Sequence, residues 1–509
     1  MSESVITSIT TARVPTYGGR LNKTALCREA LRLVDGGEYE AAVTALGGLW
    51  QGVGRRPLLT QTTVAEKALL LFTAGVLTGF QGSARQIGGA QEAAKDLLSE
   101  SLALFQEVSD DDFAAWAKCA LAVCYWRLGA IDEARIVAQE ALHSRGKISP
   151  EVTLRLHLSL IISENLAHNF KQSEIWLTRA EPLLTQVDNL TLQGSFYFER
   201  AVVQKSLAHE SLDERLHLAV TNYIAAAGYY ERVGHLSFLA SIYNNLGNLL
   251  GKLERFCEAH KYLDCGLATY RQLSDKLHQG MVWESKARLY LAEQKLSEAE
   301  NAAHTSVRFL READRFAVLA ESLTTLGSAQ ARLGKALKAE KAFRHAFSIA
   351  DTAGDRAGAG RALLCLLEEL GTQLTAADFI QTYRATVNLL GESSRLSIHR
   401  RLRALAETAA FAERSPDIVI QPTVAETLTD LPPGFSLKDT VQNLEARYIS
   451  LALEKSGNRV VQASALLGMQ HQTLSLMLRK RHKDLLARLQ KRKPRQAKNK
   501  DSRNPDDHS

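Results

Sequence analysis

A unit of about 40 residues recurs along most of the chain, and this repetition limits the possible folds more than any other feature. In each copy a turn precedes an acidic or polar pair, a small residue and an apolar helical pattern, as in RLGAIDEARIVAQEAL (127–142) and RLGKALKAEKAFRHAF (332–347). The small residue recurs at Ala42, Ala94, Ala134, Ser173, Ala219, Ala259, Ala299 and Ala339, the last four at intervals of 40. Because one unit cannot bury its own apolar faces, the sequence predicts a stack of helical hairpins.

A second small residue lies twelve positions before five of these, at Ala30, Ala122, Gly247, Ala287 and Gly327. Small side chains on both helices of a hairpin let the two axes approach closely. Ile161 and Leu207 depart from this pattern in two other units. With only 10 prolines in 509 residues to interrupt long helices, the expected fold class is all-α.

The clearest copies are NNLGNLLGKLERFCEAHKYL (244–263) and TTLGSAQARLGKALKAEKAF (324–343). Their pattern resembles the tetratricopeptide repeat, although the unit here is about 40 rather than 34 residues long. The resemblance is strongest over 240–350, extends through 110–235 and is weakest over 20–105. It implies an α-solenoid with a concave surface that binds peptides or partner helices.

The resembled repeat also implies which polar residues of the first helices face that groove. The expected positions are Ser241, Asn244, Asn248, Glu284, Arg288, Glu321, Thr324 and Ser328. An Asn side chain there can hydrogen-bond the backbone of an extended peptide whatever its sequence. The alternative is that these residues are simply solvated polar positions.

The repeat pattern fades after Leu405, and four of the ten prolines then fall between residues 416 and 433. Proline denies such a segment a continuous helix. We therefore expect five segments: a disordered N-terminus (1–20), the repeat solenoid (21–410), a proline-containing linker (411–436), a helix-turn-helix domain (437–490) and a disordered tail, basic and then acidic (491–509).

The segment after the linker has the pattern of three short helices. An apolar stripe over 437–455 comprises Val441, Leu444, Tyr448, Leu451 and Ala452, and Ser436 is placed to cap that helix. Gly457 can end this helix and Asn458 can cap the next one, which is expected at Arg459–Leu467. Gly468 then permits a sharp turn before a third helix from about Gln470.

Two short helices joined by a glycine-containing turn form a helix-turn-helix, and Ala463, Ser464 and Ala465 supply the small residues that the helix crossing needs. On the third helix Leu474 and Leu478 are expected to face inward. The candidate DNA-binding residues are Gln470, His471, Gln472, Thr473 and Ser475 for base edges, and Arg479, Lys480, Arg481 and Lys483 for phosphates.

Residues 436–480, and particularly ALEKSGN (452–458), ASALLG (463–468) and TLSLML (473–478), resemble the Fis-type helix-turn-helix of bacterial enhancer-binding activators. The resemblance implies dimerisation through the first long helices and DNA reading by the third. This sequence departs from the family at His471, Leu476 and Met477, where the family usually has positive charge. Met477 could fill the small core, and Leu476 could touch a thymine methyl group or a partner.

Positive charge is concentrated at one end of the chain. Residues 479–500 carry eleven Lys/Arg against one acidic residue, whereas the whole chain has a net charge of +6. A polyanionic partner is therefore expected at this end, with the tail adding salt-sensitive affinity or acting only to keep the chain in solution.

Motifs of several enzyme classes are missing from the sequence. GKISP, GKLER and GKALK lack the rest of a P-loop, and neither H-E-x-x-H nor G-x-S-x-G occurs. We expect no enzyme activity, no cofactor and no metal. The six cysteines form no C-x-x-C pair and are expected to be buried thiols. There is no apolar run of 18 residues and no secretory signal pattern, so a cytoplasmic, non-membrane protein is expected.

These features predict a sequence-specific DNA-binding transcriptional regulator that acts at the bacterial nucleoid as a homodimer on double-stranded DNA. Its repeats would sense a protein or peptide partner, or drive oligomerisation. The alternative is a non-catalytic interaction scaffold whose basic end binds nucleic acid without sequence choice.

Overall fold

The computed structural model describes residues 16–17, 20–144, 146–208, 214–313, 316–393, 396–414, 437–482 and 485. The chain divides into two compact units, Met1–Gln421 and Pro422–Ser509. Nearly all of the predicted disordered N-terminus, residues 415–436 of the predicted linker and the predicted tail lie outside the described residues. So do Ser436 and Lys483.

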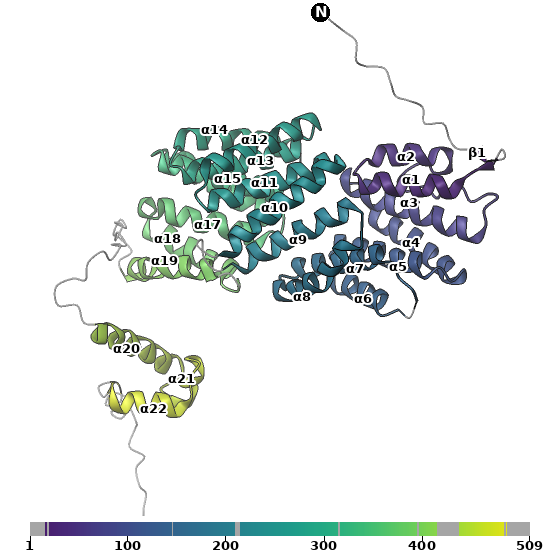
Figure 1. The fold of residues 1–509 in the computed structure, drawn as a ribbon. Coiled ribbons are helices and arrows are strands. Elements are labelled where there is room, and N and C mark those ends of the chain that lie inside the picture. The colour runs from purple at the N-terminus through teal and green to yellow at the C-terminus, as the bar shows by residue number, and fades with distance from the viewer. Residues whose placement is uncertain are drawn as a thin grey trace, which may run out of the picture. The chain divides into compact units, whose positions relative to one another are not determined.

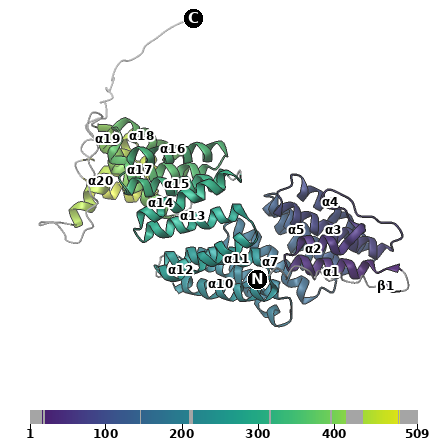
Figure 2. The same cartoon turned by 90° about the horizontal axis from the view of Figure 1, so that it is seen from above.

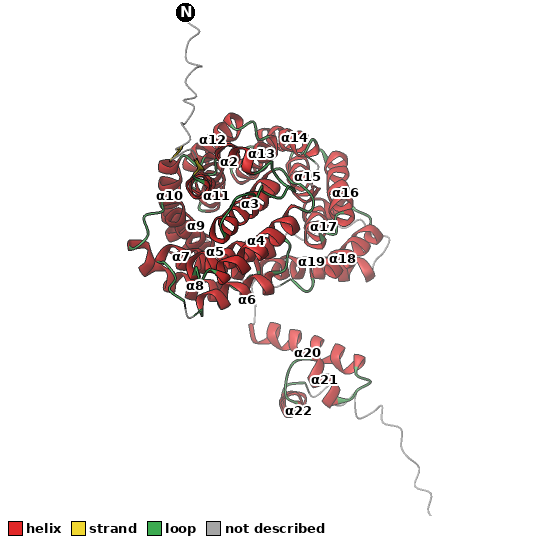
Figure 3. Cartoon of the chain, turned by 90° about the vertical axis from the view of Figure 1, so that its right-hand side faces the viewer, coloured by secondary structure: helices red, strands yellow, loops and turns green. Residues whose placement is uncertain are grey.

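The first unit is an array of helices (Figures 1 and 3). A short antiparallel pair, β1 (Thr16–Tyr17) and β2 (Arg20–Leu21), precedes it. The helices are α1 (Lys23–Asp35), α2 (Tyr39–Leu46), α3 (Val64–Ala84), α4 (Ala90–Glu107), α5 (Asp111–Arg127), α6 (Ile131–Leu142), α7 (Pro150–Leu166), α8 (Phe170–Ala180), α9 (Leu190–Leu207), α10 (Glu214–Val233), α11 (Leu236–Lys252), α12 (Phe256–Gln272), α13 (Lys276–Ala292), α14 (Leu296–Arg311), α15 (Phe316–Arg332), α16 (Ala336–Thr352), α17 (Arg356–Leu370), α18 (Ala376–Leu390) and α19 (Leu396–Arg414). Short 3₁₀ turns lie at Gly47–Leu49, Glu181–Thr185 and Gly371–Gln373.

Consecutive helices pack as hairpins, from α1 with α2 to α17 with α18 (Figure 2). The first helices of neighbouring hairpins also contact one another, as in α5 with α7, α11 with α13 and α13 with α15. The odd-numbered helices therefore form one layer of the solenoid, and the even-numbered helices cover them on the other side. The predicted all-α solenoid is confirmed.

The small residues of the repeat lie where helices cross. The eight small residues predicted on the second helices are all fully buried. So are three of those predicted on the first helices, Ala30, Ala122 and Ala287. At Gly247 an added Cβ would lie 2.6 Å from Cγ of Leu263, and at Gly327 it would lie 2.8 Å from the Phe343 ring. The close approach inferred from the sequence is confirmed, because the two glycines have no room for a side chain.

The turns inside the hairpins repeat one backbone conformation. The second residue after the first helix has a positive φ at Gly129, His168, Glu254, Gln294 and Gly334, between +58° and +83°. In this left-handed position glycine is free of the strain that a side chain causes. Three of the five turns nevertheless carry a side chain there.

The cysteine prediction is partly wrong. Cys27, Cys119 and Cys124 are buried, and burial raises the pKa of the Cys119 thiol to about 12. Cys257 and Cys265, however, are exposed on α12, and Cys365 is half-buried. The helical periodicity around Cys257 and Cys265 did not indicate which side of α12 faces the neighbouring helices.

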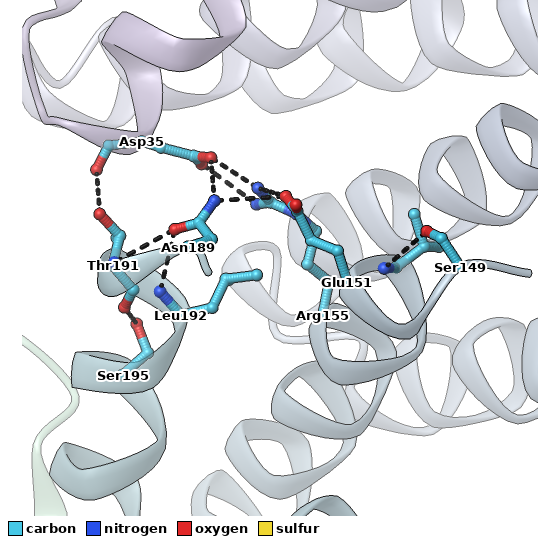
Figure 4. Close-up of polar contacts among 9 residues, drawn as sticks. Asp35, Ser149, Glu151, Arg155, Asn189, Thr191, Leu192 and Ser195 are labelled. Carbon is cyan, nitrogen blue, oxygen red and sulfur yellow. Dashed lines mark hydrogen bonds and ion pairs between the residues drawn. The ribbon is translucent and has the colours of Figure 1, made fainter. Parts of the chain in front are cut away.

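The first hairpin contacts helices far away in the sequence. The Asp35 carboxylate, at the end of α1, accepts hydrogen bonds from the Arg155 guanidinium of α7 and from Nδ2 of Asn189, and Thr191 Oγ1 donates to the Asp35 carbonyl (Figure 4). A Cβ on Gly37 would lie 2.5 Å from the His235 ring, just before α11. The start of the solenoid is therefore held against the beginnings of α9 and α11.

The second unit contains α20 (Leu437–Lys455), α21 (Val460–Leu466) and α22 (His471–Lys480). Helix α21 packs against both of the others. None of the described helices in either unit combines the length and apolar character needed to cross a membrane.

Candidate nucleic-acid interface

The three helices of the second unit share a small apolar core. Ala463, Leu474 and Leu478 are at most 1% exposed, and Ile449 and Leu453 of α20 are 2% and 4% exposed. The inward orientation predicted for Leu474 and Leu478 is therefore confirmed. Because α22 is fixed from one side by these leucines, its opposite side is presented to solvent.

The predicted apolar stripe on α20 is partly wrong. Ala452 is buried, but Tyr448 and Leu451 are 52% and 48% exposed, and Ile449 and Leu453 take the inner positions instead. The side chains of Val441 and Leu444 lie outside the described part of the structure. The periodicity identified a helix without fixing its rotation about its own axis.

The turns around α21 also correct two predictions. Asn458 does not cap α21, because it adopts a left-handed conformation (φ +65°) and Arg459 occupies the cap position without a side-chain hydrogen bond. Ala463 and Ser464 are buried at the crossing as predicted, but Ala465 is exposed. Gly468 has φ +65°, and the Met469 amide donates to the Ser464 carbonyl to close the turn into α22.

The candidate base-reading side chains lie at the start of α22. Gln470 is the residue before its first turn, and Gln470, His471, Gln472 and Thr473 are exposed, whereas Ser475 is half-buried. Arg479 and Lys480 are exposed in the last turn. The structure therefore brings polar and cationic candidates to one short helix, with the polar group at its N-terminal end.

Arg481 has a partner that the sequence did not indicate. Its Nη1 lies 3.1 Å from Oε1 of Glu445 on α20, and Gln442 donates to its carbonyl oxygen. The buried His482 ring contacts the same Glu445 carboxylate at 3.2 Å. Glu445 therefore ties α20 to the end of α22. Glu445 lies 36 residues before Arg481, so no local sequence pattern indicated that the two would pair.

The two unusual residues in the middle of α22 have different surroundings. Met477 packs against the core of the unit, as suggested from the sequence. Leu476 is 52% exposed and so lies on the same open side as the polar candidates.

In the repeat unit, the predicted groove residues contact one another across hairpins. Asn248 donates to Ser285 Oγ at 2.9 Å and accepts from Arg288 at 3.2 Å, and Arg288 also pairs with Glu284 at 3.0 Å. Glu284 accepts from Thr325, and Glu321 pairs with Arg361 at 2.9 Å. The partners from different hairpins are 37 to 41 residues apart, so this polar ladder follows the repeat period.

The ladder changes the charge state and the availability of its members. Burial raises the pKa of Glu284 above its ordinary value, although the Arg288 guanidinium opposes the shift. Thr324 and Ser328 donate to carbonyl oxygens of their own helix, and Ser328 is only 8% exposed. Ser241 is half-buried, and Oδ1 of Asn244 is buried without a partner among the described residues.

A pocket of about 310 Å³ opens beside this ladder, between α11 and α13. Asn248, Ser285 and Arg288 line it together with Lys252. Sequence reasoning missed Ser285 and Lys252, because nothing in the repeat pattern singles out their side chains. Within the described residues, no group of three or more His, Cys, Asp or Glu side chains could hold a metal ion.

Two family models match the chain. Residues 320–352 match the tetratricopeptide repeat, and residues 440–480 match the bacterial regulatory protein, Fis family. No curated protein matches the chain as a relative.

Solved structures with a similar arrangement of helices include PH0952 from Pyrococcus horikoshii, a STAND protein with a tetratricopeptide repeat sensor (14% identity, TM-score 0.46). The match covers 74% of this chain and 54% of that protein, so the chain spans about half of its length. A Rap protein complexed with competence and sporulation factor (14% identity, 68% of this chain and 99% of that chain, TM-score 0.47) and yeast Tom70 (12% identity, 77% and 82%, TM-score 0.40) are also similar. By the family models, the chain carries a tetratricopeptide repeat at residues 320–352 and, after it, a Fis-type helix-turn-helix at residues 440–480.

Proposed function

We propose that the chain is a sequence-specific DNA-binding transcriptional regulator of the bacterial cytoplasm. The observation that carries this proposal is the presentation of α22. Its inner side is anchored by Leu474 and Leu478, its exposed N-terminal end carries amide, imidazole and hydroxyl groups, and its last turn carries exposed Arg479 and Lys480. Polar groups of that kind can hydrogen-bond base edges in the major groove, and the cations neutralise phosphates.

Two copies of the second unit would act together. Tyr448 and Leu451 lie three residues apart on α20 and expose about half of their surfaces, which suits them to pack against the same helix of a second chain. A two-fold dimer of this kind places two recognition helices in major grooves one helical turn of DNA apart. The homodimer is therefore part of the proposal.

The repeat unit is proposed to receive a protein partner. The pocket between α11 and α13 presents the cations Lys252 and Arg288 beside the amide of Asn248, which suits a polar segment carrying carboxylates. The buried Oδ1 of Asn244 lacks a partner among the described residues, and a bound backbone amide could supply one.

The DNA-binding proposal is tested by the salt dependence of binding. Fluorescence anisotropy of a labelled mixed-sequence duplex is measured with full-length wild type and with the Arg479→Ala, Lys480→Ala double variant. We expect the slope of log K against log salt concentration to become shallower by roughly 2, because each lost phosphate contact removes about 0.9. Arg344→Ala, an exposed charge on α16, is the matched control and should leave the slope unchanged. An unchanged slope in the double variant would overturn the assignment.

A further inference from the structure

A chamber of about 170 Å³ lies inside the first half of the repeat unit, separate from the pocket beside Arg288. Helices α1, α3, α5, α7 and α9 all contribute to its wall. Most of the lining is apolar, including Val76, Phe80, Trp116, Leu158 and Ile162. This volume is about what one aromatic ring requires, since an apolar cavity of roughly 150 Å³ accepts benzene.

The first hairpin bounds the chamber on one side. Leu31, Val34 and Asp35 of α1 line it, and Asp35 is bound to Arg155, Asn189 and Thr191 at distances of 2.5 to 3.1 Å (Figure 4). These contacts join residues 120 to 156 positions apart. At about 170 Å³, the chamber has room for a small molecule rather than for an extended peptide.

Two donors on the wall have no hydrogen-bond partner within the described residues. Ser159 is 3% exposed, and its Oγ is unpartnered, as is Nε of Arg155 one helical turn earlier. Both residues line the chamber. The other hydroxyl on the wall is satisfied, because Ser195 Oγ bonds to Thr191 O and to the Tyr230 hydroxyl. Buried donors are nearly always paired in native proteins, so a ligand acceptor at this position would complete the site.

The charge balance at the site favours a neutral ligand. The guanidinium of Arg155 is already paired with Asp35 at 2.5 Å and with Glu151 at 2.8 Å. One cation facing two carboxylates leaves no net positive charge to attract an anion. The unpartnered groups can therefore donate to an oxygen atom without requiring that it be charged.

We propose that this chamber binds a neutral molecule of about the size of one aromatic ring that carries a single oxygen acceptor. Ser159, together with Nε of Arg155, donates to that oxygen, and the ring occupies the apolar space beside Trp116 and Phe80. This small-molecule site does not depend on the DNA-binding role or on the groove pocket.

The test measures binding of phenol, toluene and benzoate to the full-length chain by ligand-observed NMR and calorimetry. Phenol and toluene have the same number of heavy atoms and differ in the oxygen. We expect phenol to bind one molecule per chain, toluene to bind about tenfold more weakly because it leaves the donors unpaired, and benzoate to bind more weakly than phenol. Ser159→Ala should remove most of the preference for phenol while keeping the binding of toluene.

A pair of matched variants locates the binding. Ala120→Leu adds atoms at the chamber wall, whereas Ala114→Leu adds the same atoms to the same helix away from the chamber. Both residues are half-buried, and helical circular dichroism verifies that both variants fold. We expect Ala120→Leu to abolish phenol binding and Ala114→Leu to retain it. Failure of every probe to bind, equal affinity in the two Leu variants, or tightest binding of benzoate would overturn the proposal.

Discussion

At the scale of single residues, the repeat turns carry strain that the sequence could avoid. Gln294 is exposed and has φ +60°, whereas Gly334 occupies the same position one unit later. We expect Gln294→Gly to raise the free energy of unfolding by roughly 0.5–1 kcal/mol, because glycine adopts this conformation without the Cβ clash. Thermal unfolding checks this, with Gln294→Ala as the control that should give no gain. Equal effects of the two variants would contradict the explanation.

Glu199 on α9 gives the fold a pH dependence. Burial raises its pKa from 4.5 to about 7, opposed only by a hydrogen bond from Asn165 Nδ2. The folded chain therefore holds this proton more tightly than the unfolded chain. The stabilisation that this bound proton gives the folded chain is lost as the pH rises from about 4.5 to about 7, and none of it remains at higher pH.

Replacing Glu199 by Gln removes the charge that burial penalises. We expect Glu199→Gln to be more stable than wild type above pH 7 by roughly 1–3 kcal/mol, since one pKa unit corresponds to about 1.4 kcal/mol. The advantage should vanish near pH 4.5. Urea unfolding at several pH values measures it, and an advantage that does not change with pH would exclude titration of Glu199 as the cause.

At the scale of elements, one ion pair joins α1 to α7. Arg155 is 11% exposed, stacks 4.6 Å over the Trp116 ring and holds Asp35. We expect Arg155→Met to destabilise the chain by about 2–4 kcal/mol, because it leaves a largely buried carboxylate without its partner. Arg344→Met, which breaks an exposed pair within α16, should cost less than about 0.5 kcal/mol. Comparable losses in denaturant unfolding would show that the α1–α7 contact is not stabilising.

Helix α20 is the element on which the proposed dimer depends. We expect Leu451→Glu to convert the full-length chain from dimer to monomer in analytical ultracentrifugation, because it places charge in the apolar face that also contains Tyr448. Leu466→Glu, a 60% exposed position on α21, is the matched control and should leave the dimer intact. If wild type sediments as a monomer at every concentration, the homodimer proposal fails.

The sequence predicted contacts within a repeat better than contacts between distant segments. Ala259 and Gly247 could be identified because close helix packing requires small residues at a fixed spacing. Arg155 with Asp35, and Glu445 with Arg481, could not, since these pairs depend on how the helices are placed in three dimensions. Likewise the stripe on α20 indicated a helix, but Tyr448 and Leu451 proved to be on its outer side.

At the scale of the whole molecule, the two units present different kinds of surface. The repeat unit pairs its polar groove residues in a ladder between hairpins, in which Glu284 is buried and Arg288 and Glu321 are exposed. The second unit keeps the polar start of α22 open. This difference supports the proposed division between partner binding in the first unit and DNA binding in the second.

Selection of binding sequences from a random duplex pool tests the central claim, sequence-specific DNA recognition, most directly. Full-length wild type should enrich a motif with two half-sites about one helical turn apart. The Gln472→Ala, Thr473→Ala variant should lose that enrichment while keeping salt-sensitive binding, because the exposed cations of the last turn of α22 remain. A wild-type pool indistinguishable from the input would contradict the account and leave a scaffold that binds nucleic acid without sequence choice.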